Sequence, residues 1–398
     1  MVELRDLFAP SRGRRATPNE TCGRRRTAAR DAGRGPVNMR ALVAVAALLL
    51  ADGASFAEPV PPATQEGDYL ARNFHFASGA TLPELRLHYT TLGQPVRDGH
   101  GHVTNAILIL HGTGGDGHQF LRPQFAGELF GPGQPLDVAK YYVILPDAIG
   151  HGRSSKPSDG AHARFPEYGY ADMVAAQHLL VTEGLGVDHL RLVMGTSMGC
   201  MHSFVWGETY PDFMDSLMPL ACLPVQIAGR NRMWRKMLID AIRDDPAWAG
   251  GEYRTEPRAA LRTASDLLLI AGTAPLYAQA TLPTRDAADQ RVVEYTNAQL
   301  ATLDANDLLY QVSASRDYDP SGRLGEIRAP VLWVNSADDF INPPELGIAE
   351  KCVRELKHGR FVLLPISERT RGHGSHTWAV LWKSELVALL EESARAAR

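Results

Sequence analysis

Cysteine is scarce in this sequence of 398 residues, which contains only four. Three of them, Cys200, Cys222 and Cys352, follow residue 57. So few cysteines exclude a fold that depends on a dense disulfide framework. Because three cysteines cannot all pair within one chain, we expect at least one thiol to lie buried as an apolar side chain.

Long apolar runs and strong net charge are also missing. The apolar run at residues 41–50 has ten residues, which is too short to cross a bilayer. Hydrophobic residues make up 44% of the chain and charged residues 22%, so a disordered chain and a multi-span membrane protein are excluded. A formal net charge of −4 gives no general attraction to phosphate backbones, and no nucleic-acid partner is expected.

The charged residues are unevenly distributed along the chain. Residues 1–38 contain nine arginines, no lysine and four acidic residues, a balance of +5. The other 32 basic and 41 acidic residues give a balance of −9. The functional body of the protein is therefore acidic.

A secretory signal peptide is predicted at residues 39–57. Met39 and Arg40 form a short basic start, the apolar run follows, and the small residues Ser55 and Ala57 stand at positions −3 and −1 of a cleavage site. A buried hydrophobic helix is the alternative, but prolines follow at once at positions 59, 61 and 62. We expect cleavage after Ala57, a periplasmic or secreted mature protein, and no membrane span after cleavage.

Residues 1–38 precede the basic start of this signal peptide. A signal peptide normally begins at its own basic region, so we interpret residues 1–38 as an upstream extension outside the native protein. The pair Arg14-Arg15 could be a twin-arginine address, but it lies far from the apolar run.

From about residue 85 onward, short β-rich runs alternate with longer helical ones. Strands are predicted at residues 85–89, 105–110, 141–145, 190–194, 217–221, 331–335 and 360–364. Helices are predicted at residues 171–183, 198–209, 344–356 and 377–392. Nearly continuous apolar strands separated by helices indicate an α/β fold whose mostly parallel sheet is covered on both faces.

The alternation stops in residues 223–324, where helical spacing dominates at 233–242, 259–270 and 286–303. An insertion of this size at the carboxyl edge of a sheet usually covers a site. We therefore predict a core formed by residues 58–222 and 325–398, with residues 223–324 as a helical lid.

A nucleophilic serine is predicted at Ser197. Gly195-Thr-Ser-Met-Gly199 stands between a predicted strand and a predicted helix. In a G-x-S-x-G turn the serine adopts a strained backbone, and the glycines on both sides avoid collisions with it. Five residues are a weak signal alone, but the strand–turn–helix context makes it specific.

A serine nucleophile needs a general base and an acid that orients the base. In α/β folds with a G-x-S-x-G turn after a strand, the order along the chain is serine, acid, histidine. Asp338 and Asp339 follow one late strand, and His373 and His376 follow the last. We predict Asp338 as the acid and His373, which stands between two glycines, as the base. Asp339 and His376 are expected to be solvated surface residues.

The tetrahedral intermediate needs N–H donors for its oxyanion. Met198, directly after the serine, and Thr113, in the loop after an early strand, are predicted to provide them.

The same loop contains G-x-G-x-x-G at Gly112, Gly114 and Gly117, a pattern found in dinucleotide-binding sites. Prolines and glycines interrupt the helix that should follow this loop. No strand that ends in an acidic residue follows at the distance that a dinucleotide site requires. We therefore expect no nucleotide. The histidines at 100, 102, 111 and 118 lack the spacing of a metal site, so neither a metal nor another cofactor is expected.

Residues 85–392 resemble the α/β-hydrolase superfamily, and more narrowly its homoserine O-acetyltransferase-like branch. The resemblance is carried by residues 172–180, 195–201, 210–212, 241–246, 250–253 and 337–343. It implies an α/β-hydrolase fold, with Ser197, Asp338 and His373 as the triad and Thr113 and Met198 as oxyanion donors. At the position of the family's arginine that binds a substrate carboxylate, this sequence has Ile239-Asp240.

We therefore expect an exported serine ester hydrolase that acts on a small-molecule ester through an acyl-enzyme. The first alternative is an acyltransferase of the homoserine O-acetyltransferase type that uses acyl-CoA. The second is a non-catalytic ligand-binding protein on the same fold. The resemblance also implies a possible homodimer formed through the lids.

Overall fold

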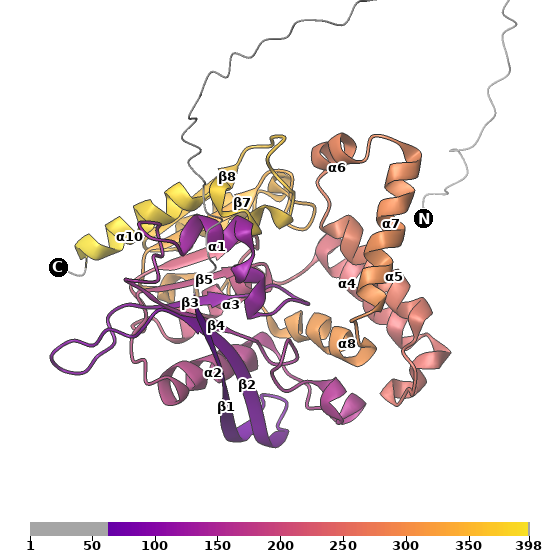
Figure 1. Ribbon diagram of the computed structural model, residues 1–398, viewed down its shortest axis with the longest axis horizontal. Helices are drawn as coiled ribbons and strands as arrows, with labels where there is room; N and C mark the ends of the chain where they lie inside the picture. The colour runs from indigo at the N-terminus through magenta and orange to yellow at the C-terminus, as the bar shows by residue number, and fades with distance from the viewer. Residues whose placement is uncertain (1–62, 397–398) are drawn as a thin grey trace, which may run out of the picture. The chain divides into compact units, whose positions relative to one another are not determined.

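The computed structural model describes residues 63–396. The predicted upstream extension at 1–38 and the predicted signal peptide at 39–57 lie outside the described residues. Residues 63–396 form an α/β structure around one central sheet (Figure 1).

The sheet has eight strands in the order β1-β2-β4-β3-β5-β6-β7-β8. β1 and β2 pair antiparallel with each other, β2 pairs antiparallel with β4, and all remaining pairs are parallel. The strands are β1 (Thr64–His75), β2 (Thr81–Leu92), β3 (Ala106–Leu110), β4 (Tyr142–Pro146), β5 (Leu192–Thr196), β6 (Leu217–Leu220), β7 (Val331–Ser336) and β8 (Gly359–Leu364).

Both faces of the sheet are covered, as the apolar strands predicted. On β3, Leu108 belongs to a core cluster on one face, and its neighbours Ile107 and Ile109 belong to the cluster on the other. Helices α2 (Tyr170–Leu179) and α3 (Met198–Thr209) contribute to the first cluster. Helices α1 (Pro123–Leu129) and α10 (Lys383–Ala396) contribute to the second. Alternate side chains of a strand point to opposite faces, so an all-apolar strand needs both layers.

Residues between β6 and β7 form only helices and turns. They include α4 (Gly229–Arg243), α5 (Arg258–Ala271), α6 (Pro275–Thr281), α7 (Arg285–Leu300) and α8 (Ala305–Ser313). Trp234, Leu238, Leu261 and Leu308 are buried together in a separate apolar cluster, so this insertion has a core of its own. α4, α5 and α7 stand beside one another (Figure 1).

The helix predicted at 344–356 is broken in the structure. A 3₁₀ turn at Pro344–Leu346 ends at Gly347, whose φ is +57°, and the short α9 follows at Ala349–Cys352. A glycine in the left-handed region is a common helix stop.

One disulfide joins Cys200 on α3 to Cys222 just after β6, with their Cα atoms 5.8 Å apart. Cys352 is free and buried, as expected of at least one thiol. Within residues 63–396, no helix combines the length and the apolar character needed to cross a membrane.

Candidate active site

Ser197 occupies the sharp turn between β5 and α3. Its φ is 56° and its ψ −109°, a strained conformation for a residue with a side chain. A Cβ on Gly195 would lie 2.1 Å from the carbonyl oxygen of Gly199, and a Cβ on Gly199 would lie 2.0 Å from that of Leu110. Only glycine fits at these two positions, which explains the G-x-S-x-G pattern.

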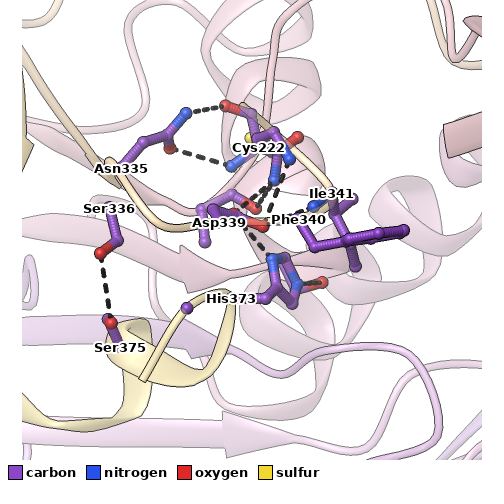
Figure 2. A network of polar contacts seen from close by, with 12 residues as sticks. Cys222, Asn335, Ser336, Asp339, Phe340, Ile341, His373 and Ser375 are labelled. Carbon is purple, nitrogen blue, oxygen red and sulfur yellow. Dashed lines mark hydrogen bonds and ion pairs between the residues drawn. The ribbon is translucent and has the colours of Figure 1, made fainter. Parts of the chain in front are cut away.

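A chain of two hydrogen bonds leads away from this serine. His373 Nε2 lies 2.8 Å from Ser197 Oγ, and His373 Nδ1 lies 2.9 Å from Asp339 Oδ2. Figure 2 shows the imidazole of His373 facing Asp339. Because an ionised carboxylate can only accept, Nδ1–H donates to Asp339 and leaves Nε2 free to accept from the serine hydroxyl. This is the protonation state of a general base.

Asp339 is fully buried and held by several donors. Its carboxylate accepts hydrogen bonds from the backbone of Ile341 and from the backbone and side-chain amide of Asn342. Burial alone would raise the pKa of Asp339, but the charge and hydrogen bond of His373, with the bonds from Asn342 and Ile341, lower it below its usual value. Asp339 is therefore an anion suited to stabilising an imidazolium.

The prediction that Asp338 orients the histidine is wrong in its geometry. The Asp338 carboxylate accepts from Thr370 Oγ1 at 2.8 Å and from the backbone N–H of Gly372 at 3.2 Å. The turn after β7 sends these two neighbouring carboxylates in different directions, and only Asp339 points at His373. Sequence order does not reveal which of two adjacent residues a turn aims inward.

The expectation that Asp339 and His376 are solvated surface residues is also wrong, since Asp339 is buried and His376 is half-buried. Asp339 is 2% exposed. The ring of His376 lies edge-on to the ring of His373, with centroids 5.2 Å apart. Burial, together with the charge of a protonated His373, lowers the pKa of His376 to about 3, so its ring is neutral, and the ring that bonds Ser197 is that of His373.

The loop that contains Thr113 lies against the serine. A Cβ on Gly112 would come within 3.3 Å of Ser197 Cβ. His111 holds this loop, since its ring Nδ1 bonds the Gly112 carbonyl, its Nε2 accepts from the Ala148 N–H, and its carbonyl accepts from the Gly199 N–H. Burial lowers the pKa of His111, so the ring is a neutral support. Thr113 and Met198 therefore both lie in segments next to Ser197.

A cavity of about 520 Å³ opens beside Ser197 and His373. Much of its lining is apolar, including Met201, Leu223, Val225, Ile227, Ile341 and Leu346. Arg235 on α4 also lines it and is only 3% exposed. Its guanidinium donates to Asn231 Oδ1 and Ser315 Oγ, both neutral. Arg235 could not be singled out from the sequence, because burial of a charge leaves no local sequence signal.

Metal ligands do not cluster in the described part of the chain. Within residues 63–396, no group of three or more His, Cys, Asp or Glu side chains could hold a metal ion.

Comparisons with known proteins agree with the fold. Residues 105–365 match the family described as alpha/beta hydrolase fold. A probable acyltransferase of Methanothermobacter thermautotrophicus is 32% identical over 274 residues, which cover 69% of this chain and 82% of the relative. The homoserine O-acetyltransferase of Geotalea daltonii is 30% identical over 335 residues, covering 74% and 88%.

Two solved structures extend the comparison. The acetyl esterase MekB superimposes with a TM-score of 0.72 at 25% identity, covering 82% of this chain and 97% of the esterase. Homoserine O-acetyltransferase from Bacillus anthracis has the same TM-score and coverage at 21% identity, a level that supports the fold alone. The chain is therefore an enzyme of the α/β-hydrolase family and belongs to its homoserine O-acetyltransferase-like branch.

Proposed function

We propose that this protein is an exported serine ester hydrolase that acts on a small-molecule ester. The observation that carries the proposal is the unbroken hydrogen-bond chain from Ser197 Oγ through His373 to Asp339, at the wall of a cavity large enough for a substrate. A serine hydroxyl alone is a weak nucleophile, and such a chain activates it.

In the proposed reaction, Ser197 Oγ attacks the ester carbonyl carbon while His373 Nε2 takes the serine proton. The backbone N–H groups of Thr113 and Met198 stabilise the oxyanion. The intermediate collapses, and the alcohol leaves with the proton from His373. Water then attacks the acyl-enzyme in the same way, with His373 as the base. Collapse of this second intermediate regenerates Ser197 and releases the acid. Asp339 keeps the imidazole in the required tautomer and stabilises its positive charge.

Export is supported by two features of the chain. Residues 39–57 have the organisation of a signal peptide, and the Cys200–Cys222 disulfide is of a kind that persists in oxidising compartments. Expression of the full gene in a bacterial host and identification of the mature N-terminus test this. A protein that begins at Glu58 supports export, and an uncleaved protein in the cytoplasm contradicts it.

An acyltransferase is the second candidate function. Curated relatives are named homoserine O-acetyltransferases, and the cavity contains Arg235, a buried cation without an acidic partner among the described residues. A buried charge is costly unless it is paired, so Arg235 would favour a substrate with a carboxylate, such as an amino-acid alcohol. Export opposes this function, because acyl-CoA is an intracellular donor.

One set of assays separates these functions. The full chain is incubated with p-nitrophenyl acetate, and separately with acetyl-CoA and homoserine, with Ser197→Ala as the control. We expect ester hydrolysis that falls at least about a thousandfold in Ser197→Ala. Acetyl-CoA consumption that requires homoserine would favour the acyltransferase. No turnover in either assay would favour a ligand-binding protein and contradict the proposal.

A further inference from the structure

Arg371 stands two residues before His373 in the loop that follows β8, residues 365–373, which we call the catalytic loop. It connects this loop to the helices inserted between β6 and β7. Its guanidinium carbon lies 3.7 Å from the ring centroid of Tyr277 on α6 and 4.9 Å from that of Trp378. Nη1 donates to the carbonyl oxygens of Glu368 at 2.8 Å and Thr370 at 2.9 Å. The guanidinium is thus fixed to its own loop and stacked on an aromatic ring of the insertion at the same time.

Helix α6 has little other anchorage of its own. None of its side chains, from Pro275 to Thr281, is buried. Ala274, directly before it, is buried and faces the catalytic loop, since a Cβ on Gly372 would lie 3.3 Å from Ala274 Cβ. A short helix without buried side chains has low local stability, and the stack of Tyr277 on Arg371 joins this helix to the loop that contains His373.

The opposite side of the loop is held by the sheet. The Asp338 carboxylate accepts from Thr370 and from the backbone of Gly372. The backbone N–H of Arg371 donates to Ser375 Oγ, which lies 3.3 Å from Ser336 Oγ on β7. His373 therefore lies in a loop held by β7 and the turn after it on one side and by α6 on the other.

We propose that Arg371 is a positioning residue that couples the inserted helices to the general base. While Tyr277 covers the guanidinium, the loop keeps the His373 imidazole between Ser197 and Asp339. When α6 moves away, the stack is lost and the loop loses one of its two supports. This inference rests on the proposed role of His373 as the base. A misplacement of about 1 Å in a catalytic group can cost about a hundredfold in rate.

The test compares four variants with p-nitrophenyl acetate as the substrate. Arg371→Ala and Tyr277→Ala should each lower kcat by about tenfold to a hundredfold with little change in KM. Tyr277→Phe keeps the aromatic face and should retain wild-type kcat. Arg291→Ala is the matched control, because Arg291 stacks on Tyr295 within α7 at 5.4 Å and should leave kcat unchanged.

The double variant Arg371→Ala/Tyr277→Ala shows whether the two residues act as one unit. A loss no larger than that of either single variant supports the coupling. A loss equal to the product of the two single losses means that they act independently and overturns it. Unchanged kcat in Tyr277→Ala, or losses explained by a lower folded fraction at the assay temperature, overturn it as well.

Proton NMR supplies a readout that does not require turnover. The His373 Nδ1 proton, hydrogen-bonded to Asp339, should give a downfield resonance in the wild type that broadens in Arg371→Ala and Tyr277→Ala but not in Arg291→Ala. An unchanged resonance in both variants contradicts the inference. If the wild type hydrolyses no ester, the proposed function fails while this resonance still tests the coupling.

Discussion

At the residue scale, two adjacent carboxylates have different surroundings, and we propose different tasks for them. Asp339 is buried against His373, and Asp338 binds the backbone and side chains of the loop that contains His373. The sequence could predict that an acid follows β7, because chain order is fixed in this fold. It could not predict which aspartate, because the choice depends on the side chain directions in one turn.

Exchange of each carboxylate for its amide tests this assignment. Asp339→Asn should lower kcat for p-nitrophenyl acetate by about 10³ to 10⁴, because an amide can stabilise the wrong tautomer of His373. Asp338→Asn keeps an acceptor for Thr370 and Gly372, and we expect a loss of about tenfold or less. Steady-state kinetics measures both. A larger loss of kcat in Asp338→Asn than in Asp339→Asn would mean that Asp338 is the acid that orients His373.

A second prediction at this scale concerns His202, a ring buried beside Tyr170 and hydrogen-bonded to Gln177. Burial lowers the pKa of His202 from 6.5 to about 3. Below pH 6.5 the unfolded chain therefore binds a proton that the folded protein does not bind. The free energy of unfolding falls as the pH drops, by up to about 1.4 kcal/mol per pH unit from this residue.

His202→Gln removes the imidazole that takes up this proton in the unfolded chain. Urea unfolding of both proteins between about pH 7 and pH 5 should show a steeper loss of stability in the wild type. Glu208 and Glu256, whose pKa values burial raises to about 7, act in the opposite direction, but equally in both proteins, so they cancel in the difference. Parallel pH profiles would mean that His202 does not stay neutral.

At the element scale, buried strands could be predicted better than exposed ones. The apolar residues of β3, β4 and β5 identified these strands to within two residues at either end. β1 was missed, because most of its side chains are exposed and polar and show no apolar alternation. α6 was missed for a related reason, since a helix without buried side chains has no apolar stripe. For strands, the apolar pattern reports burial, so a strand that buries little leaves little signal. Among the helices the rule is weaker, since α8 was missed although most of its residues are buried.

The nucleophile turn gives a prediction at this scale. Gly199→Ala would place a Cβ 2.0 Å from the Leu110 carbonyl oxygen and should destabilise the protein by roughly 2 to 4 kcal/mol. Gly127→Ala in α1, where nothing lies within 4 Å, is the matched control and should stabilise by about 0.5 to 1 kcal/mol. Thermal unfolding measures both. Equal melting temperatures for the two variants would contradict the steric account of the turn.

At the scale of the whole molecule, one covalent link ties α3 to the end of β6. The two cysteines are 22 residues apart, and closing a loop of this length stabilises a folded protein by about 3 kcal/mol. This pairing could not be predicted from the sequence, because a separation of 22 residues says nothing about contact in space.

Removal of the disulfide should lower stability by about that amount. Cys200→Ala/Cys222→Ala should unfold at a lower urea concentration than the oxidised wild type. Reductant should destabilise the wild type and leave the double variant unaffected. If reductant changes neither protein, the disulfide does not stabilise the fold.

We propose that Ser197 becomes a nucleophile through His373 and Asp339. Rapid mixing of the full chain with p-nitrophenyl acetate, followed by acid quench and peptide mass spectrometry, tests it most directly. We expect an acetyl group on the peptide that contains Ser197, formed much more slowly in Asp339→Asn and absent in Ser197→Ala. Ester hydrolysis that continues in Ser197→Ala, or an acetyl group on another residue, would contradict it.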